Sequence, residues 1–154
     1  DLLAEDFTLE LWFNSRNIDN GGFLLSQWYP YSYDYAGYCF YLGGPNAVGM
    51  GMYASNYTGL NFPCSTMLSN TWYHLVYIRQ SGVFKVYLDG VFQSSVTNAA
   101  SITSSSKLVL IGANQDQNLF GNKFNGYIQD MRLMNRYVKY TANFTPPQGP
   151  ARLK

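Results

Sequence analysis

Apolar and polar residues alternate along much of this chain, which is the pattern of a strand with one buried face. In residues 7–13 the alternation places Phe7, Leu9, Leu11 and Phe13 on one side. Helical periodicity is hard to find. The pattern therefore predicts strands along most of the sequence.

Two hairpins are the clearest feature of the middle of the chain. Residues 72–79 alternate, Gln80-Ser81-Gly82 turns the chain, and residues 83–88 return. Asp89-Gly90 is a strong two-residue turn signal, and it precedes a further strand at 91–93.

Further strands, the last of them long, are expected where apolar runs stand between clusters of Gly, Asn and Pro. They cover residues 23–28, 38–42, 48–54, 59–62, 107–112 and 124–133. Such a series of short strands predicts an all-β fold, an antiparallel β-sandwich or jelly roll. The chain has 154 residues and no internal repeat or long linker, so we expect one domain over 1–147 and an irregular tail over 148–154.

The charge balance argues against two kinds of partner. Ten Lys plus Arg face nine Asp plus Glu, and the cations are scattered, so no nucleic-acid partner is expected. No stretch approaches the roughly 20 apolar residues of a membrane helix, so no membrane insertion is expected.

Only 12% of residues are charged while 18% are aromatic, which leaves Ser, Thr, Asn, Gln, Gly and Tyr to cover the surface. Surfaces of this kind are common outside cells and in repetitive assemblies.

Five segments, in this order, resemble the concanavalin A-like jelly roll, specifically its laminin-G-like branch. They are Asp6–Phe13, Trp72–Val76, Val86–Gly90, Leu110–Gly112 and Phe124–Arg132. The ending, Arg136–Pro147, is similar to the close of laminin-G-like domains in phage and other virion proteins. The resemblance implies a binding role on a virion or another extracellular surface.

One departure from the resemblance concerns the start of the chain. Laminin-G-like domains usually carry another strand upstream of the segment that matches Asp6–Phe13, and here five residues precede Asp6. We expect either that this strand lies outside the sequence or that a neighbouring subunit, such as a second copy of the chain, completes the sheet.

The superfamily also contains glycoside hydrolases, so catalysis has to be considered. The sandwich glucanases place their carboxylates on one strand as E-x-D-x-x-E, and neither Glu5 nor Glu10 begins such a pattern. Asp89 and Asp130 are better explained by a turn and a strand end. His74, the only histidine, lies within an apolar alternation, which indicates a packed structural side chain. We therefore expect a protein that is not an enzyme.

Metal sites and disulfides have weak support. Several jelly-roll lectins and laminin-G domains bind calcium, which needs roughly six to eight oxygen ligands. Asp19 and Asp116 lie in polar loops without a second carboxylate nearby, so they are weak calcium candidates and no cofactor is expected. Cys39 and Cys64 form no CxxC pair, and we favour two separate thiols over a disulfide.

Residues 28–38 read WYPYSYDYAGY and form the most unusual stretch of the chain. A buried loop of this composition would have to satisfy every phenol hydroxyl, so a surface connection between two strands is expected. Exposed Tyr and Trp rings suit the C–H face of a sugar, and their hydroxyls suit its polar edge. The candidate site comprises Trp28, Tyr29, Tyr31, Tyr33, Asp34 and Tyr35, with Asn46, Tyr53, Asn56 and Tyr57 from neighbouring loops.

Two functions fit a surface of this kind. The first is a carbohydrate-binding or adhesion module that binds a glycan through the tyrosine-rich loops. The second is a structural assembly or decoration domain of a virion, whose aromatic surface contacts other protein subunits. The residues alone do not separate these two hypotheses.

Overall fold

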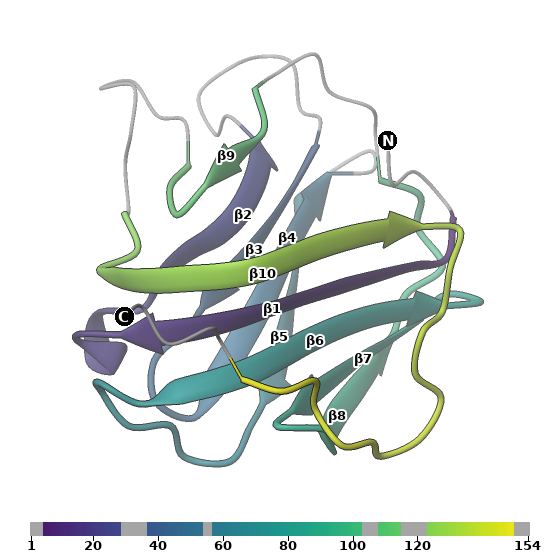
Figure 1. Ribbon diagram of the computed structural model, residues 1–154. Coiled ribbons are helices and arrows are strands. Elements are labelled where there is room, and N and C mark those ends of the chain that lie inside the picture. The colour runs from purple at the N-terminus through teal and green to yellow at the C-terminus, as the bar shows by residue number, and fades with distance from the viewer. Residues whose placement is uncertain (1–4, 29–36, 54–56, 103–107, 115–122, 150–154) are drawn as a thin grey trace.

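The computed structural model describes residues 5–28, 37–53, 57–102, 108–114 and 123–149. Two five-stranded antiparallel sheets pack face to face, in the strand orders β10-β1-β6-β7-β8 and β5-β4-β3-β2-β9 (Figure 1). The strands are β1 Phe7–Ser15, β2 Gly22–Trp28, β3 Gly37–Leu42, β4 Ala47–Tyr53, β5 Tyr57–Pro63, β6 Trp72–Gln80, β7 Val83–Leu88, β8 Val91–Thr97, β9 Leu110–Ile111 and β10 Gly126–Asn135. The prediction of an antiparallel β-sandwich is confirmed.

Side-chain alternation along β1 builds one half of the core. Phe7, Leu9, Leu11 and Phe13 are all fully buried between the sheets, as the sequence predicted. Phe7 meets Phe40 of β3 edge to face, with ring centroids 5.9 Å apart. Edge-to-face contacts of this kind stabilise a core beyond the area that they bury.

Tyr77 ties the two sheets together through a polar contact. Its ring lies in the core, and its hydroxyl donates to the carbonyl oxygens of Tyr41 and Gly49 at 3.2 and 3.1 Å. Because a buried hydroxyl without a partner is costly, these bonds fix where β6 stands against β3 and β4.

The segment after β10, residues 136–149, has no regular secondary structure and crosses the outer face of the first sheet (Figure 1). Its apolar side chains Val138, Tyr140 and Phe144 form a second small core, whose members on the sheet are Val76, Ile78 and Tyr87. The segment therefore covers the part of this outer face that β6 and β7 form. We call residues 136–149 the C-terminal segment.

Gly90 in the hairpin turn holds the C-terminal segment at Phe144. Its φ of 77° is one that glycine adopts without strain, and its carbonyl accepts the Phe144 amide at 2.9 Å. A Cβ at this position would lie 1.9 Å from the Phe144 oxygen. The Asp89-Gly90 turn thus serves both the hairpin and the docking of the C-terminal segment.

Some expected strand limits are wrong. The strand expected over 107–112 is only Leu110–Ile111 in the described part of the chain, and the last strand begins at Gly126 rather than at Phe124. Asp130 lies inside β10 and not at its end. The register shifts between Glu10 and Trp12 of the paired strand, and Asp130 takes a φ of 51°, which identifies a β-bulge.

Within the described residues, no helix is long and apolar enough to cross a membrane.

Candidate functional site

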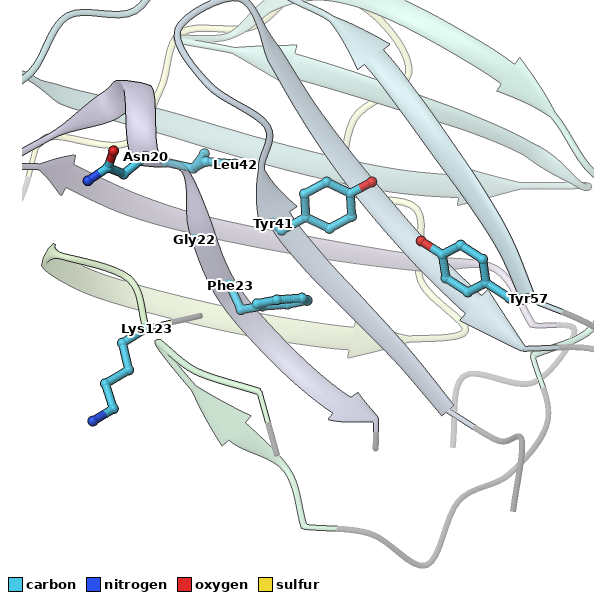
Figure 2. Close-up of a pocket in the computed structure, with 7 residues that line it drawn as sticks. All are labelled: Asn20, Gly22, Phe23, Tyr41, Leu42, Tyr57 and Lys123. Atoms are coloured by element: carbon cyan, nitrogen blue, oxygen red, sulfur yellow. The ribbon is translucent and has the colours of Figure 1, made fainter. Parts of the chain in front are cut away.

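The outer face of the second sheet carries a hollow of about 280 Å³ (Figure 2). Phe23, Tyr41 and Tyr57 face it from β2, β3 and β5, because side chains alternate along a strand and these three do not enter the core. Its lining comprises Asn20, Gly22, Phe23, Tyr41, Leu42, Tyr57 and Lys123. Phe23, Tyr41 and Tyr57 supply the aromatic surface of the hollow.

The strand between Tyr41 and Tyr57 has glycine at two outward positions. A Cβ on Gly49 would lie 2.2 Å from Cζ of Tyr41, and a Cβ on Gly51 would lie 3.0 Å from Cε2 of Tyr57. The ends of both rings therefore occupy the space that side chains of β4 would otherwise fill. Tyr41 reaches over β4 from β3, and Tyr57 reaches over it from β5.

The two phenol groups meet above β4. Figure 2 shows their hydroxyls pointing toward each other, and a side-chain hydrogen bond joins them. We call the two rings the tyrosine platform. Phe23 lies at an angle beside it, with its ring centroid 5.8 Å from that of Tyr41 and an interplanar angle of 55°.

The platform is uncharged at neutral pH. Burial raises the pKa of Tyr57 to about 12, and the nearby hydroxyl of Tyr41 acts in the same direction. Burial likewise raises the pKa of Tyr41. The thiol of Cys39 is fully buried beside Gly51, and burial raises its pKa to about 12, so it is not a nucleophile. The site offers ring faces and neutral hydroxyls.

The polar residues of the lining stand at one end of the hollow. In Figure 2 the ammonium of Lys123 and the amide of Asn20 point away from the rings. No carboxylate appears among the described lining residues. Asp19, a calcium candidate, lies exposed in the short 3₁₀ helix Ile18–Asn20, and Asp116 lies outside the described residues. Across the described ranges, no three His, Cys, Asp or Glu side chains form a group that could hold a metal.

The structure brings together part of the predicted site. Tyr53 and Tyr57 face each other across the ends of β4 and β5, with ring centroids 5.5 Å apart. Trp28 ends β2 and pairs with Gly37, so its backbone lies at the same end of the sheet. Residues Tyr29, Tyr31, Tyr33, Asp34, Tyr35 and Asn56 of the prediction lie outside the described residues.

Asn46 is not part of this cluster. It precedes β4, whereas Tyr53 ends it, so the length of the strand, roughly 20 Å, separates the two residues. Its side chain is exposed, and its carbonyl accepts the amide of Cys64 at 2.8 Å in a turn.

Phe23 and Tyr41 were not predicted from the sequence. A signal was present in Gly49-Met50-Gly51, because glycines at every second position of a strand leave one face bare. Locating the rings above that face requires the pairing of Tyr41 with Gly49, which only the structure supplies.

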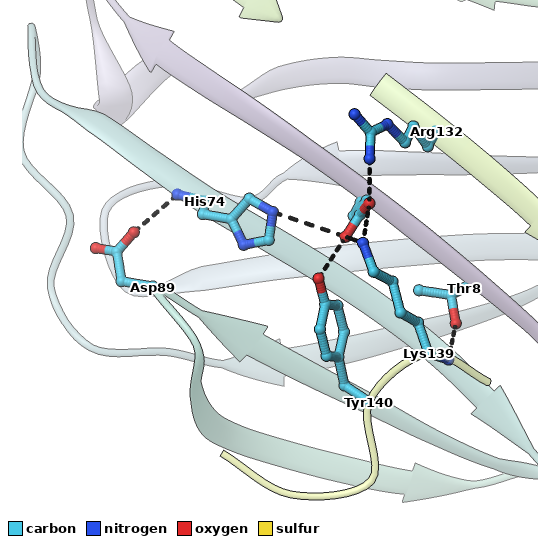
Figure 3. Close-up of polar contacts among 7 residues, drawn as sticks. Thr8, His74, Asp89, Arg132, Lys139 and Tyr140 are labelled. Atoms are coloured by element: carbon cyan, nitrogen blue, oxygen red, sulfur yellow. Dashed lines mark hydrogen bonds and ion pairs between the residues drawn. The ribbon is translucent and has the colours of Figure 1, made fainter. Parts of the chain in front are cut away.

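A second polar cluster lies on the opposite sheet around the carboxylate of Glu10 in β1, which is buried. Figure 3 labels the partners of this carboxylate, His74, Arg132, Lys139 and Tyr140. Lys139 donates to its two oxygens at 2.7 and 3.0 Å, and the Tyr140 hydroxyl donates to one of them at 2.9 Å. Nε2 of His74 lies 3.9 Å from the same carboxylate. Both Lys139 and Tyr140 belong to the C-terminal segment, so this cluster anchors that segment to β1.

The Glu10 cluster is poorly suited to catalysis. Both carboxylate oxygens already accept hydrogen bonds, and the adjoining hollow has a volume of only about 90 Å³. That is the share of about three water molecules in the liquid. His74 is 1% exposed and its ring packs 5.1 Å from that of Trp12, as expected of a structural histidine.

The fold and the pattern of the strands define a lectin-like sandwich, and comparison with known proteins identifies the family. The chain matches the family model of the concanavalin A-like lectin/glucanases superfamily (Laminin_G_3) over residues 1–140, and it belongs to this family. A search of curated proteins finds no match.

Solved structures with the same fold include proteins that bind or process sugars. The CBM40 module of the Ruminococcus gnavus IT-sialidase, bound to α2,3-sialyllactose, is 16% identical at a TM-score of 0.74, with 89% of this chain and 79% of that one covered. A leech intramolecular trans-sialidase is 14% identical at 0.72, with 85% and 21% covered. A SAP-like pentraxin from Limulus polyphemus is 16% identical at 0.59, with 85% and 64% covered. At these identities the likeness shows the fold alone.

Removing the cation that neutralises Glu10 tests the anchoring role. We expect Lys139→Met to lower the free energy of unfolding by roughly 2–4 kcal/mol, because it leaves a buried carboxylate without its main partner. The control is Arg136→Met, which breaks the exposed ion pair with Glu5 and should cost less than about 1 kcal/mol. Urea denaturation measures both, and equal losses would contradict the anchoring role.

Acid should weaken the fold through His74. The pKa of His74 is lowered to about 4, chiefly by burial; the charge of Glu10 acts against this shift and the charge of Lys139 adds to it. The unfolded chain takes up this proton near pH 6.5, so stability is complete above that pH and falls, by roughly 3 kcal/mol at most, as the pH approaches 4. His74→Phe should flatten the pH dependence of the urea midpoint in this range. An unchanged slope would show that other groups cause the loss.

Proposed function

We propose that this domain is a non-enzymatic carbohydrate-binding module that holds a glycan in the hollow on the outer face of the second sheet. The observation that carries the proposal is the aromatic lining of a 280 Å³ hollow by Phe23, Tyr41 and Tyr57. Concave sites lined by aromatic side chains with a few polar groups are the usual form of small-ligand sites. The C–H face of a sugar ring fits such a surface, and the phenol hydroxyls are suited to its polar edge.

The family adds independent support. Solved structures of this fold include a carbohydrate-binding module with a bound sialylated sugar. The C-terminal segment covers the opposite outer face over β6 and β7, and the hollow beside Glu10 measures only about 90 Å³. The second sheet therefore offers the better surface for a glycan.

The proposed binding role also suggests where the parent protein works. We propose that it acts at an extracellular or virion surface, where the module attaches it to a host or environmental polysaccharide. Trp28 and Gly37, which flank the tyrosine-rich residues in the sequence, lie at the end of the sheet where Tyr53 and Tyr57 lie. We propose that residues 29–35 contribute to the same binding role.

A contact with other protein subunits is the second candidate. It is favoured by the edge strand β10, where Tyr127 and Leu133 are 47% and 39% exposed. An exposed strand edge with apolar side chains is suited to pairing with a strand of another chain. Under this alternative the purified domain would assemble, whereas a carbohydrate-binding module need not.

A glycan array, read beside light scattering, tests the proposal. We expect saturable binding by the wild-type domain and a loss of at least about tenfold, or about 1.4 kcal/mol, in Tyr57→Ala. The matched control is Tyr137→Ala, which removes a similarly exposed tyrosine from the C-terminal segment and should bind as wild type. The double variant Tyr31→Ala/Tyr33→Ala measures how much the tyrosine-rich residues 29–35 contribute to the binding affinity. A folded wild-type domain that binds no glycan, and that assembles, would favour the subunit-contact role.

A further inference from the structure

We infer that the ligand is a linear, uncharged saccharide of at least two units, which lies across the strands with the flat faces of neighbouring sugar rings on Tyr41 and Tyr57. This inference rests on the proposed function and names the class of ligand that the same site would take.

The rings of the tyrosine platform lie flat against the outer surface of the sheet. The Cε2, Cζ and hydroxyl oxygen of Tyr41 are 2.2–2.4 Å from the position of a Cβ on Gly49, directly above the backbone of β4. A ring that stood upright on β3 could not reach this position. Figure 2 shows the faces of Tyr41 and Tyr57 side by side, whereas the ring of Phe23 is seen edge-on. The site thus has a flat floor with an upright wall beside Tyr41.

The floor is longer than a single sugar ring. It extends from Tyr57 on β5 across β4 to Tyr41 on β3, where Phe23 on β2 bounds it. The two strand spacings from β5 to β3 amount to about 10 Å. Two adjacent ring faces, held by a hydrogen bond between their hydroxyls, present two stacking positions. A chain of sugars uses both positions, whereas one terminal sugar uses one.

The floor has no charge to match an acidic sugar. Its hydroxyls are neutral, and the ammonium of Lys123, which is the one cation of the described lining, points away from the rings. The face of an aromatic ring carries partial negative charge. It attracts the C–H groups of a sugar and repels the lone pairs of its hydroxyl oxygens. Pyranoses whose hydroxyls are all equatorial, such as glucose, present C–H groups on both faces. An axial hydroxyl would press a polar group against a phenol ring.

A length series tests the ligand class. The probes are β1,4-linked glucose oligomers of one to six units, with α2,3-sialyllactose as the acidic terminal sugar, and calorimetry measures the affinity. We expect the affinity to rise at least tenfold from one unit to three. If glucose binds as tightly as its oligomers, or if sialyllactose binds most tightly, the inference is wrong while the carbohydrate-binding function stands. If no sugar of the array or the series binds, both fail.

Two substitutions separate ring faces from hydroxyls. Tyr57→Phe keeps the ring and removes the hydroxyl, so it should retain oligosaccharide binding within about threefold, whereas Tyr57→Ala should lose it. Tyr57 is 48% exposed, so both variants should fold. If Tyr57→Phe binds as weakly as Tyr57→Ala, the hydroxyl rather than the ring face carries the contact, and the stacking inference is wrong.

Gly49→Ala tests the platform without removing an aromatic group. Its Cβ would collide with the far end of Tyr41, which can swing aside, so the fold should survive while the flat ring face is lost. We expect at least tenfold weaker oligosaccharide binding. The control is Gly149→Ala, whose Cβ would have no atom nearer than 3.8 Å and which lies beside Trp12, away from the hollow. Wild-type affinity in a folded Gly49→Ala variant would exclude Tyr41 from the site.

Discussion

The bare outer face of β4 is the constraint on which the candidate site depends. Gly49 and Gly51 leave no side chain there, and only this lets Tyr41 and Tyr57 lie across the strand with their hydroxyls joined. Any larger residue at Gly49 would raise the ring of Tyr41 from the sheet. Glycine weakens a strand, so two glycines in the middle of β4 lower its stability, and the proposed binding surface would account for them.

The two outer faces of the sandwich differ in what lies on them. One is covered over β6 and β7 by the C-terminal segment, which the buried Glu10 holds through Lys139 and Tyr140. The other carries a hollow with aromatic walls and little charge. Covering part of one face with the C-terminal segment leaves the second sheet as the more open position for a ligand. The carboxylate that the domain buries at Glu10 is therefore structural, and the ring faces that it leaves open are suited to binding.

The sequence was sufficient for the fold because the core follows local alternation. Phe7, Leu9, Leu11 and Phe13 are buried as their spacing predicts, and the Asp89-Gly90 turn is where it was expected. The sequence was less informative about irregularity, since the bulge at Asp130 depends on how β10 pairs with β1.

The candidate site was predicted only in part. Tyr53 and Tyr57 meet because they are near in sequence across a short connection, whereas Phe23 and Tyr41 join them through the pairing of strands. Asn46 lies apart from them, because successive loops of an antiparallel sheet leave from opposite ends of the strands. Binding on the tyrosine platform can be observed residue by residue in a titration of ¹⁵N-labelled protein with a glucose oligomer, followed by amide shifts. We predict the largest shifts in β3, β4 and β5 around Gly49, Gly51 and Tyr57. Saturable shifts confined to residues 29–35 or to the C-terminal segment would contradict binding on the platform.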